Sequence, residues 1–144
     1  MNRLFTFIAI ALIFWAGNLT KVKAEIMNKE IQLVQEWDKT FPKSEKVKHE
    51  KVTFKTQYGL TLAADLYIPK NAEGKLPAIA VSGPFGAVKE QCSGLYAQTM
   101  AERGFITIAF DPSFTGESTG EPRRTASPDI NTEDFLAAVD YLSM

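Results

Sequence analysis

The fold of this 144-residue chain is decided by two apolar runs, Pro77-Ala-Ile-Ala-Val-Ser82 and Phe105-Ile-Thr-Ile-Ala-Phe110. Between them lie a turn sequence, Gly83-Pro-Phe-Gly86, and a segment of helical periodicity over about residues 88–103. Two buried strands joined by a helix form a βαβ unit, whose strands are parallel in one sheet. Open α/β sheets bind ligands outside the carboxyl ends of their strands, so we expect the functional site at residues 83–86 and 111–120.

The composition predicts one globular α/β domain and excludes several kinds of site. The formal net charge of −1 gives no basic face, so nucleic acid is not expected as a partner. A single cysteine, Cys92, excludes an internal disulfide framework and a Cys-rich zinc site. A single histidine, His49, excludes a His-pair metal motif. We therefore expect no metal and no cofactor.

The N-terminus has the layout of a targeting segment. Arg3 supplies a positive charge, residues 4–15 are almost continuously apolar, and Val22-Lys-Ala24 resembles a small-residue cleavage site. The apolar run is shorter than the roughly 20 residues that a spanning helix needs. We expect residues 1–24 to be a secretory signal, which predicts a periplasmic or secreted protein. The alternative is an uncleaved membrane anchor formed by residues 4–18.

Residues 25–46 are expected to form an N-terminal helix and a charged connector. Ile31, Val34, Trp37 and Phe41 fall close to helical spacing, which predicts a helix over residues 26–41 that packs on the sheet edge. We interpret His49, which follows the connector, as a surface residue without a catalytic role.

A β-hairpin is predicted before the βαβ unit. Apolar and polar residues alternate over residues 52–54 and again over residues 60–68. Gln57-Tyr-Gly59 between the two runs is a turn sequence, and two alternating runs about a glycine turn are typical of antiparallel strands.

The turn at residues 83–86 is the strongest candidate for chemistry. Small residues let the backbone turn tightly at the end of a strand, and the amides of Phe85 and Gly86 would then face the mouth of the site. Backbone amides that point at a developing negative oxygen are what acyl transfer requires. An ordinary strand-to-helix turn is the alternative. Lys89 and Glu90 are interpreted as a local ion pair at the start of the helix.

The helix that follows is predicted to bury one apolar side. The residues at the spacing of one helical face are Cys92, Leu95, Tyr96, Thr99 and Met100. Cys92 is therefore expected to be a buried, inert thiol, and no histidine follows it to act as a base.

Several motifs together resemble the α/β-hydrolase superfamily, in particular its dienelactone-hydrolase-like and Xaa-Pro-dipeptidyl-peptidase-like branch. The motifs are Gly83-Pro-Phe-Gly-Ala-Val-Lys-Glu-Gln91, Ala101-Glu-Arg-Gly-Phe105, Ala109-Phe-Asp111, Gly116-Glu-Ser-Thr-Gly-Glu-Pro-Arg123 and Glu133-Asp134. The resemblance implies a mostly parallel sheet opened by a hairpin, a Ser, acid and His triad, and an ester, lactone or amide substrate. It also implies that Phe85 supplies an oxyanion-hole amide, with Gly86 as the alternative.

One serine matches the nucleophile motif but lies in the wrong context. Gly116-Glu-Ser-Thr-Gly120 fits G-x-S-x-G, yet in the nucleophile elbow a strand runs directly into the turn and then into a helix. Here residues 111–115 separate the motif from the strand, Pro122 follows it, and no histidine comes later. We therefore interpret Ser118 as a decoy and Asp111 as a structural loop residue.

The last segment is expected to be a helix, with Asn131 and Asp134 as its capping pair. In the resembled family the nucleophile elbow, acid and histidine come after this helix. We therefore expect residues 47–144 to be the N-terminal half of an α/β-hydrolase domain, truncated before the elbow and inactive alone.

An incomplete sheet has an unpaired edge, here the strand at residues 77–82, and such an edge invites pairing with another chain. The alternative function is therefore a non-catalytic α/β binding module that self-associates or pairs with another chain.

Overall fold

The computed structural model describes residues 31–144, so the signal segment expected at residues 1–24 lies outside the described residues. The elements, in chain order, are the strands β1 (Val47–Lys55), β2 (Thr61–Pro69) and β3 (Ala78–Val81), the helix α2 (Cys92–Ala101), the strand β4 (Ile106–Phe110) and the helix α3 (Pro128–Ser143). The expected hairpin, βαβ unit and final helix are all present.

The four strands form one sheet in the order β1-β2-β4-β3. β1 and β2 make the antiparallel hairpin, whose turn is closed by a hydrogen bond from the Gly59 N–H to the Thr56 carbonyl. β3 and β4 pair in parallel from Ala78↔Ile106 to Val81↔Ala109, as the crossover through α2 requires. β4 is the one strand among residues 31–144 that pairs with β3, so β3 lies at an edge of the sheet.

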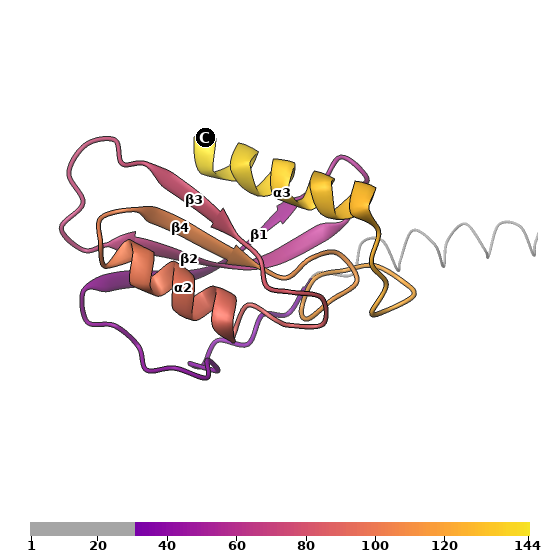
Figure 1. Ribbon diagram of the computed structural model, residues 1–144, viewed down its shortest axis with the longest axis horizontal. Helices are drawn as coiled ribbons and strands as arrows, with labels where there is room; N and C mark the ends of the chain where they lie inside the picture. The colour runs from indigo at the N-terminus through magenta and orange to yellow at the C-terminus, as the bar shows by residue number, and fades with distance from the viewer. Residues whose placement is uncertain (1–30) are drawn as a thin grey trace, which may run out of the picture. The chain divides into compact units, whose positions relative to one another are not determined.

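α2 and α3 cover opposite faces of this sheet (Figure 1). Side chains alternate along β2, so that Leu62 and Ala64 pack towards α3 while Ala63 and Tyr67 lie on the α2 side. The α3 side is the larger apolar cluster, and its buried members are Phe54, Leu62, Ala64, Ile108, Phe110, Ala137 and Ala138. Two separate apolar clusters therefore fix the sheet between its helices.

The prediction of a helix over residues 26–41 is wrong for the part that the structure describes. Residues 31–46, here called the strap, form an irregular segment that contains no helix. Backbone donors of the strap bond distant partners instead of carbonyls one turn back. The Val34 N–H donates to Glu117 Oε1 at 2.9 Å, and the Thr40 N–H donates to the Glu90 carbonyl at 3.0 Å. Trp37 and Phe41 still pack edge to face at a centroid distance of 5.7 Å. The apolar spacing therefore reflected packing rather than a helix.

α2 begins at Cys92 rather than near residue 88, and it packs through its small residues. Its buried residues are Ser93, Gly94, Ala97, Gln98 and Ala101, whereas Leu95 and Tyr96 are exposed. A Cβ atom at Gly94 would lie 2.2 Å from the Lys89 carbonyl oxygen, which explains the glycine. The expected apolar face thus points outwards, and Cys92 is exposed rather than buried.

α3 begins after Ser127, with Pro128 in its first turn, so the capping pair expected at Asn131 and Asp134 is also wrong. Proline suits a first turn because its missing N–H would have no partner there. The Asn131 N–H instead donates to the Ser127 carbonyl at 2.8 Å, within the helix. The carboxylate of Asp134 is buried and bonds a different loop, described below.

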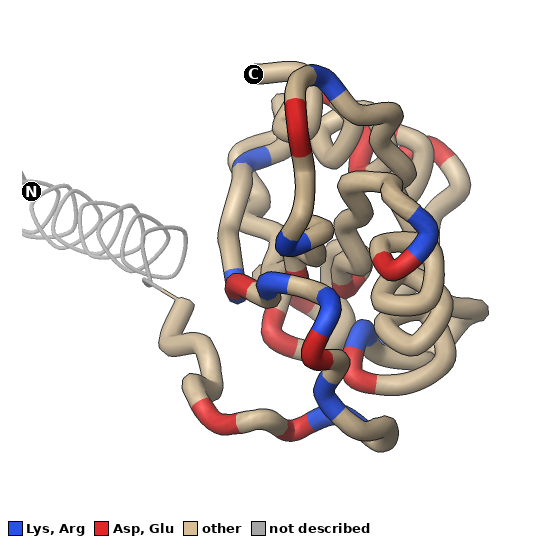
Figure 2. Tube along the Cα trace, turned by 90° about the vertical axis from the view of Figure 1, so that its left-hand side faces the viewer, with Lys and Arg blue, Asp and Glu red and all other residues tan. Residues whose placement is uncertain are grey.

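Acidic and basic positions are interspersed along the tube over residues 31–124 (Figure 2), whereas α3 carries four acidic residues and no basic one. This distribution agrees with the formal net charge of −1 for the whole sequence.

None of the helices within residues 31–144 combines the length and the apolar character needed to cross a membrane.

Candidate active site at the carboxyl ends of the strands

Two segments leave the same end of the sheet, the turn 83–91 after β3 and the loop 111–127 after β4. They lie side by side because β3 and β4 are parallel neighbours. Together with α3 they enclose a cavity of about 210 Å³. Its lining includes Ser82, Gly83, Pro84, Phe85, Gly86, Phe110, Pro112, Ala126 and Phe135. The expected location of the functional site therefore coincides with a mostly apolar cavity.

Phe85 and Gly86 occupy the two central positions of a tight turn in the wall of this cavity. The Ala87 N–H donates to the Pro84 carbonyl at 3.0 Å, and Gly86 has a φ of +84°. A positive φ at the third residue is the mark of a type II turn, and it favours glycine there. Among residues 31–144, the N–H groups of Phe85 and Gly86 have no hydrogen-bond acceptor. Two backbone donors are thus available beside the cavity.

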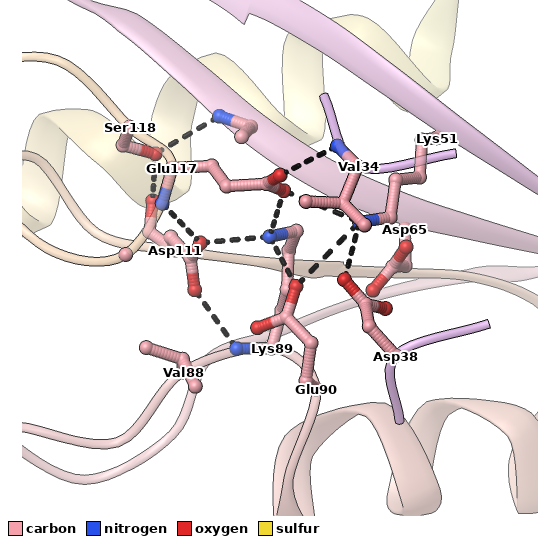
Figure 3. A network of polar contacts seen from close by, with 12 residues as sticks. Val34, Asp38, Lys51, Asp65, Val88, Lys89, Glu90, Asp111, Glu117 and Ser118 are labelled. Atoms are coloured by element: carbon pink, nitrogen blue, oxygen red, sulfur yellow. Dashed lines mark hydrogen bonds and ion pairs between the residues drawn. The ribbon is translucent and has the colours of Figure 1, made fainter. Parts of the chain in front are cut away.

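Lys89 lies beneath the turn, where its ammonium group is fully buried among carboxylates (Figure 3). Its Nζ lies 2.6 Å from Glu117 Oε2 and 2.9 Å from Asp111 Oδ2, and it also contacts Glu90. An ammonium group has three donors, so three carboxylates satisfy it fully. The Lys89–Glu90 pair expected from sequence exists, but it belongs to a buried network rather than to a helix surface.

Charge compensation keeps this network ionised. Burial alone would lower the pKa of Lys89, but the charge of Asp111 and hydrogen bonds to Glu117, Glu90 and Asp111 outweigh burial and raise it. Burial would raise the pKa of Glu117, but the hydrogen bonds from Lys89 and from the Val34 N–H lower it. Lys89 and Glu117 therefore stay charged at neutral pH, and the network ties the strap, the turn and the loop together.

The carboxylates of Glu90, Asp111 and Glu117 offer oxygens within 4.8 Å of one another, a spacing that suits a metal ion. Lys89 Nζ contacts all three, so the chain supplies the cation itself. Displacing Lys89 would leave its ammonium group buried without a partner, which is costly.

Asp111 organises the beginning of the loop. Its carboxylate accepts hydrogen bonds from the Lys89 N–H at 2.8 Å and from the Glu117 N–H at 2.9 Å. The chain passes so close that a Cβ atom at Gly116 would lie 2.1 Å from Asp111 Oδ2. All of these contacts are internal, which fits the structural role expected for Asp111.

Ser118 is 2% exposed, and its hydroxyl both donates and accepts a hydrogen bond. Its Oγ donates to the Asp111 carbonyl at 2.7 Å and accepts from the Ala63 N–H at 2.9 Å. These two bonds fasten the loop to β2. Ser118 lies outside the lining of the cavity, and the acceptor of its proton is a backbone carbonyl rather than a base.

Asp134 of α3 holds the same loop from the other side. Its carboxylate accepts from the Ser113 N–H at 2.8 Å and from Ser113 Oγ at 2.6 Å. Burial raises the pKa of Asp134; the bonds from Ser113 oppose that rise, and the charge of Glu133 adds to it. Asp134 also lines the 210 Å³ cavity, so the cavity wall contains a carboxyl group with an elevated pKa.

His49 differs from its interpretation as a free surface residue. Its Nε2 lies 2.7 Å from Asp65 Oδ1, and its ring packs against Trp37 and Tyr67 with centroid distances of 5.1 and 5.0 Å. Lys39 Nζ lies 3.0 Å from the other oxygen of Asp65. The group lies on the α2 side of the hairpin and outside the lining of the cavity.

Sequence reasoning missed the buried network because its members are far apart in the chain. Lys51 comes from β1, and it joins the network through Glu117 at 3.3 Å and Asp38 at 2.8 Å. A signal was nevertheless present in the strand pattern, since Asp65 is a charged residue in a strand that is otherwise apolar around it. A charge in such a position needs a buried partner.

Comparisons with known proteins agree with this geometry. A family model described as X-Pro dipeptidyl-peptidase (S15 family) matches residues 59–144. The uncharacterized protein PA2218 of Pseudomonas aeruginosa is 73% identical over 118 residues, which are 81% of this chain and 32% of PA2218. The crystal structure of PA2218 superposes with a TM-score of 0.78, over 81% of this chain and 37% of that one.

Two fungal relatives carry a function in their names. The thiohydrolase aneE of Aspergillus aculeatus is 34% identical over 69% of this chain and 30% of its own length. The crystal structure of the alpha/beta hydrolase GrgF from Penicillium sp. sh18 has a TM-score of 0.60 at 29% identity, over 67% of this chain and 32% of that one. The chain therefore spans about a third of the length of the curated relatives it matches.

Proposed function

Since the chain belongs to the X-Pro dipeptidyl-peptidase (S15) family, we propose that it takes part in the hydrolysis of an ester, thioester, lactone or amide through an acyl-serine. Its fold is the N-terminal part of an α/β-hydrolase fold, as the likeness to GrgF shows and as the sequence predicts. The thioester is included because aneE is a thiohydrolase.

One observation carries the proposal, namely a tight turn in which the N–H groups of Phe85 and Gly86 have no acceptor among the described residues. Donors fixed by the backbone need no reorganisation when negative charge develops on a carbonyl oxygen. The turn is rigid because a hydrogen bond closes it and Gly86 holds the required positive φ. We assign the oxyanion-stabilising donor to the amide of Phe85, with that of Gly86 as the alternative.

We further propose that residues 1–144 do not turn over an ester alone. The Ser118 hydroxyl donates to the Asp111 carbonyl and accepts from the Ala63 N–H of β2, which supports its interpretation as a decoy. The single histidine, His49, is paired with Asp65 away from the cavity. A nucleophile and a base in contact, which acyl-serine chemistry requires, are therefore not formed among residues 31–144.

The oxyanion assignment is tested by grafting residues 47–144 onto PA2218 in place of its matched segment. Proline suits the second residue of a type II turn but lacks an N–H, so Phe85→Pro removes the donor and keeps the turn. We expect Phe85→Pro to lower kcat for a p-nitrophenyl ester about 100-fold or more, whereas Phe85→Ala retains most of it. A graft that hydrolyses no ester, or equal rates in Phe85→Pro and Phe85→Ala, would contradict the assignment.

The decoy assignment is tested on the full chain with the same ester. We expect the wild type, Ser118→Ala and the control Ser143→Ala, which alters an exposed serine of α3, to remain at the buffer rate. Turnover that disappears only in Ser118→Ala would make Ser118 the nucleophile.

A second candidate function, a binding module that self-associates, is favoured by the free edge of β3 and by exposed apolar side chains. Leu95 and Tyr96 on α2 are 47% and 54% exposed, and Leu136 and Val139 on α3 are 55% and 53% exposed. An unpaired strand edge pairs readily with a second copy. Sedimentation equilibrium should then show dimers that Ala78→Lys, a charge at the exposed start of β3, converts to monomers. A monomer with a sharp cooperative melt would contradict this candidate.

Export is also proposed, on the basis of Arg3, the apolar residues 4–15 and Val22-Lys-Ala24. N-terminal sequencing of the mature protein should find a new terminus near residue 25. An intact N-terminus in a membrane fraction would instead support the anchor formed by residues 4–18.

A further inference from the structure

A second cavity adjoins the first and has a different character. It has a volume of about 490 Å³, and it lies on the side of the turn where the loop after β4 doubles back. Its lining includes Phe85, Val88, Phe114, Arg123 and Arg124. Phe85, Gly86 and Thr115 line both cavities, so the turn with the free amides stands between an apolar cavity and an arginine-lined one.

Only one of the two arginines makes side-chain hydrogen bonds within residues 31–144. Arg123 donates through its guanidinium to the carbonyls of Gly116, Ser118 and Gly120. Arg124 has no ion pair and no side-chain hydrogen bond among residues 31–144. Its side chain is exposed at the cavity, and its guanidinium donates no hydrogen bond to the described part of the chain.

The acidic residues near Arg124 are directed elsewhere. Glu117 turns its carboxylate to Lys89, Lys51 and the Val34 N–H. Glu121 accepts a hydrogen bond from the Arg123 N–H at 3.1 Å. The positive charge of Arg124 is therefore not neutralised by an ion pair within the described chain, and an anionic ligand would find it available.

Arg124 and the residue it bonds, Phe114, both have a strained backbone conformation. Arg124 has a φ of +60° and Phe114 a φ of +69°, a region that side chains other than glycine rarely adopt. The two residues are joined by a hydrogen bond of 2.9 Å from the Arg124 N–H to the Phe114 carbonyl. Strained residues that persist in this way concentrate at binding sites, which points to a role for the position of Arg124.

We propose that the second cavity binds a carboxylate group of the substrate through Arg124, with the reacting carbonyl at the Phe85 turn. The planar guanidinium fork matches a carboxylate with two parallel hydrogen bonds. Phe85, Val88 and Phe114 supply an apolar wall for the carbon chain that carries the carboxylate. The substrate class is therefore an ester or thioester whose acyl or leaving group bears a carboxylate. The link between the cavity and catalysis rests on the function proposed above.

Binding to the full chain tests the proposal without any need for turnover. The probes are 3-phenylpropionate and its neutral isostere, 3-phenylpropionamide, followed by NMR shifts of the backbone amides. We expect the carboxylate to bind about tenfold more tightly than the amide, the factor expected for one charge-assisted hydrogen bond. The largest shifts should lie at residues 85–88 and 114–124.

Three variants separate a specific site from general electrostatics. Arg124→Gln should reduce the preference for the carboxylate about tenfold, and Arg124→Lys should restore only part of it, because lysine keeps the charge and loses the fork. The matched control is Arg103→Gln, since Arg103 is also exposed but lies after α2 and lines neither cavity. Arg103→Gln should leave the preference unchanged.

Equal binding of the carboxylate and the amide would overturn the proposal, as would an equal loss of preference in Arg103→Gln and Arg124→Gln. These results concern the carboxylate site alone, because hydrolysis by the grafted protein can succeed or fail independently of them. Carboxylate binding in the absence of hydrolysis would support the cavity while counting against the oxyanion turn.

Discussion

The turn after β3 and the loop after β4 leave the same end of the sheet, yet they treat their polar groups in opposite ways. In the turn 83–91, Phe85 is 74% exposed and two backbone N–H groups have no acceptor among residues 31–144. In residues 111–120 of the loop, the Asp111 carboxylate and the Ser118 hydroxyl form hydrogen bonds inside the protein. This part of the loop therefore forms the frame, together with the buried Lys89, whereas residues 84–87 of the turn and Arg124 at the far end of the loop are left open to a ligand.

This difference supports the proposal that Ser118 is a decoy and that the turn after β3 is the part that contacts a substrate. The loop contains a serine in a nucleophile-like motif, but the hydroxyl of Ser118 is buried and makes two hydrogen bonds that fasten the loop to β2. The turn contains no reactive side chain at Phe85 or Gly86, but its main chain offers donors. Substitutions in the frame should therefore affect stability, and substitutions in the turn should affect binding.

Asp111→Ala should cause the largest loss of stability. It removes one of the three carboxylates around the buried Lys89 ammonium and the acceptor of two backbone N–H groups. We expect a decrease of about 3–5 kcal/mol in the free energy of unfolding, measured by urea denaturation with circular dichroism. The control Asp129→Ala, an exposed position in the first turn of α3, should cost less than about 1 kcal/mol. Similar losses in both variants would contradict the idea of a frame.

Gly120→Ala should rank second. Gly120 has a φ of +121°, and a Cβ atom there would lie 2.3 Å from the Phe114 ring. The clash and the backbone strain together should cost about 2–4 kcal/mol. Gly74→Ala separates the two causes, because Gly74 also has a positive φ of +67° but nothing within 4 Å. It should cost only about 1 kcal/mol, and a cost equal to that of Gly120→Ala would mean that the ring contact is unimportant.

Lys51→Met should have a moderate effect that depends on pH. Burial would raise the pKa of Asp38, but hydrogen bonds from Lys39 and Lys51 outweigh it and lower the pKa to about 2. A lowered pKa stabilises the fold above the unfolded value, near pH 4, and that stabilisation is lost as the pH falls towards 2.

We therefore expect Lys51→Met to cost about 1–3 kcal/mol at pH 7 and to flatten the loss of stability between about pH 4 and pH 2. The measurement is a series of urea titrations across that range. Lys48→Met is the control, since Lys48 lies on the same strand with its side chain 63% exposed. An unchanged pH profile in Lys51→Met would show that the network does not act through Lys51.

Phe85→Ala should change stability least and binding most. Its ring is 74% exposed, so the free energy of unfolding should change by less than about 0.5 kcal/mol. The ring lines both cavities, so the affinity for 3-phenylpropionate should fall several-fold. A large loss of stability would place Phe85 in the frame and erase the distinction between turn and loop.

The sequence predicted the sheet and the end of the sheet at which the cavity lies, because both follow from local patterns. The apolar runs of β3 and β4 and the alternation of β2 are visible in a few consecutive residues. The strap at residues 31–46 was predicted wrongly because Trp37 and Phe41 have helical spacing. The backbone N–H groups of Val34 and Thr40, however, donate to Glu117 and to the Glu90 carbonyl, far along the chain. Long-range partners of this kind leave no periodic signal.

The orientation of α2 was predicted wrongly for a related reason. The spacing of Leu95 and Tyr96 indicates an apolar face, but the close approach of the helix to the turn and strap admits only small residues such as Gly94 and Ala97. The buried network was missed for the same cause, since Lys51, Lys89 and Glu117 come from three separate segments. Distances in space decide these features, and the order of residues does not contain them.

Arg123 gives the loop a property usually associated with metal-binding loops. Its guanidinium donates hydrogen bonds to the carbonyls of Gly116, Ser118 and Gly120. A calcium ion coordinates the carbonyl oxygens of a surrounding loop in a similar arrangement. The difference is that this cation is part of the polypeptide. A chelator cannot strip it, a competing ion cannot replace it, and the loop takes its shape when the chain folds rather than when an ion arrives.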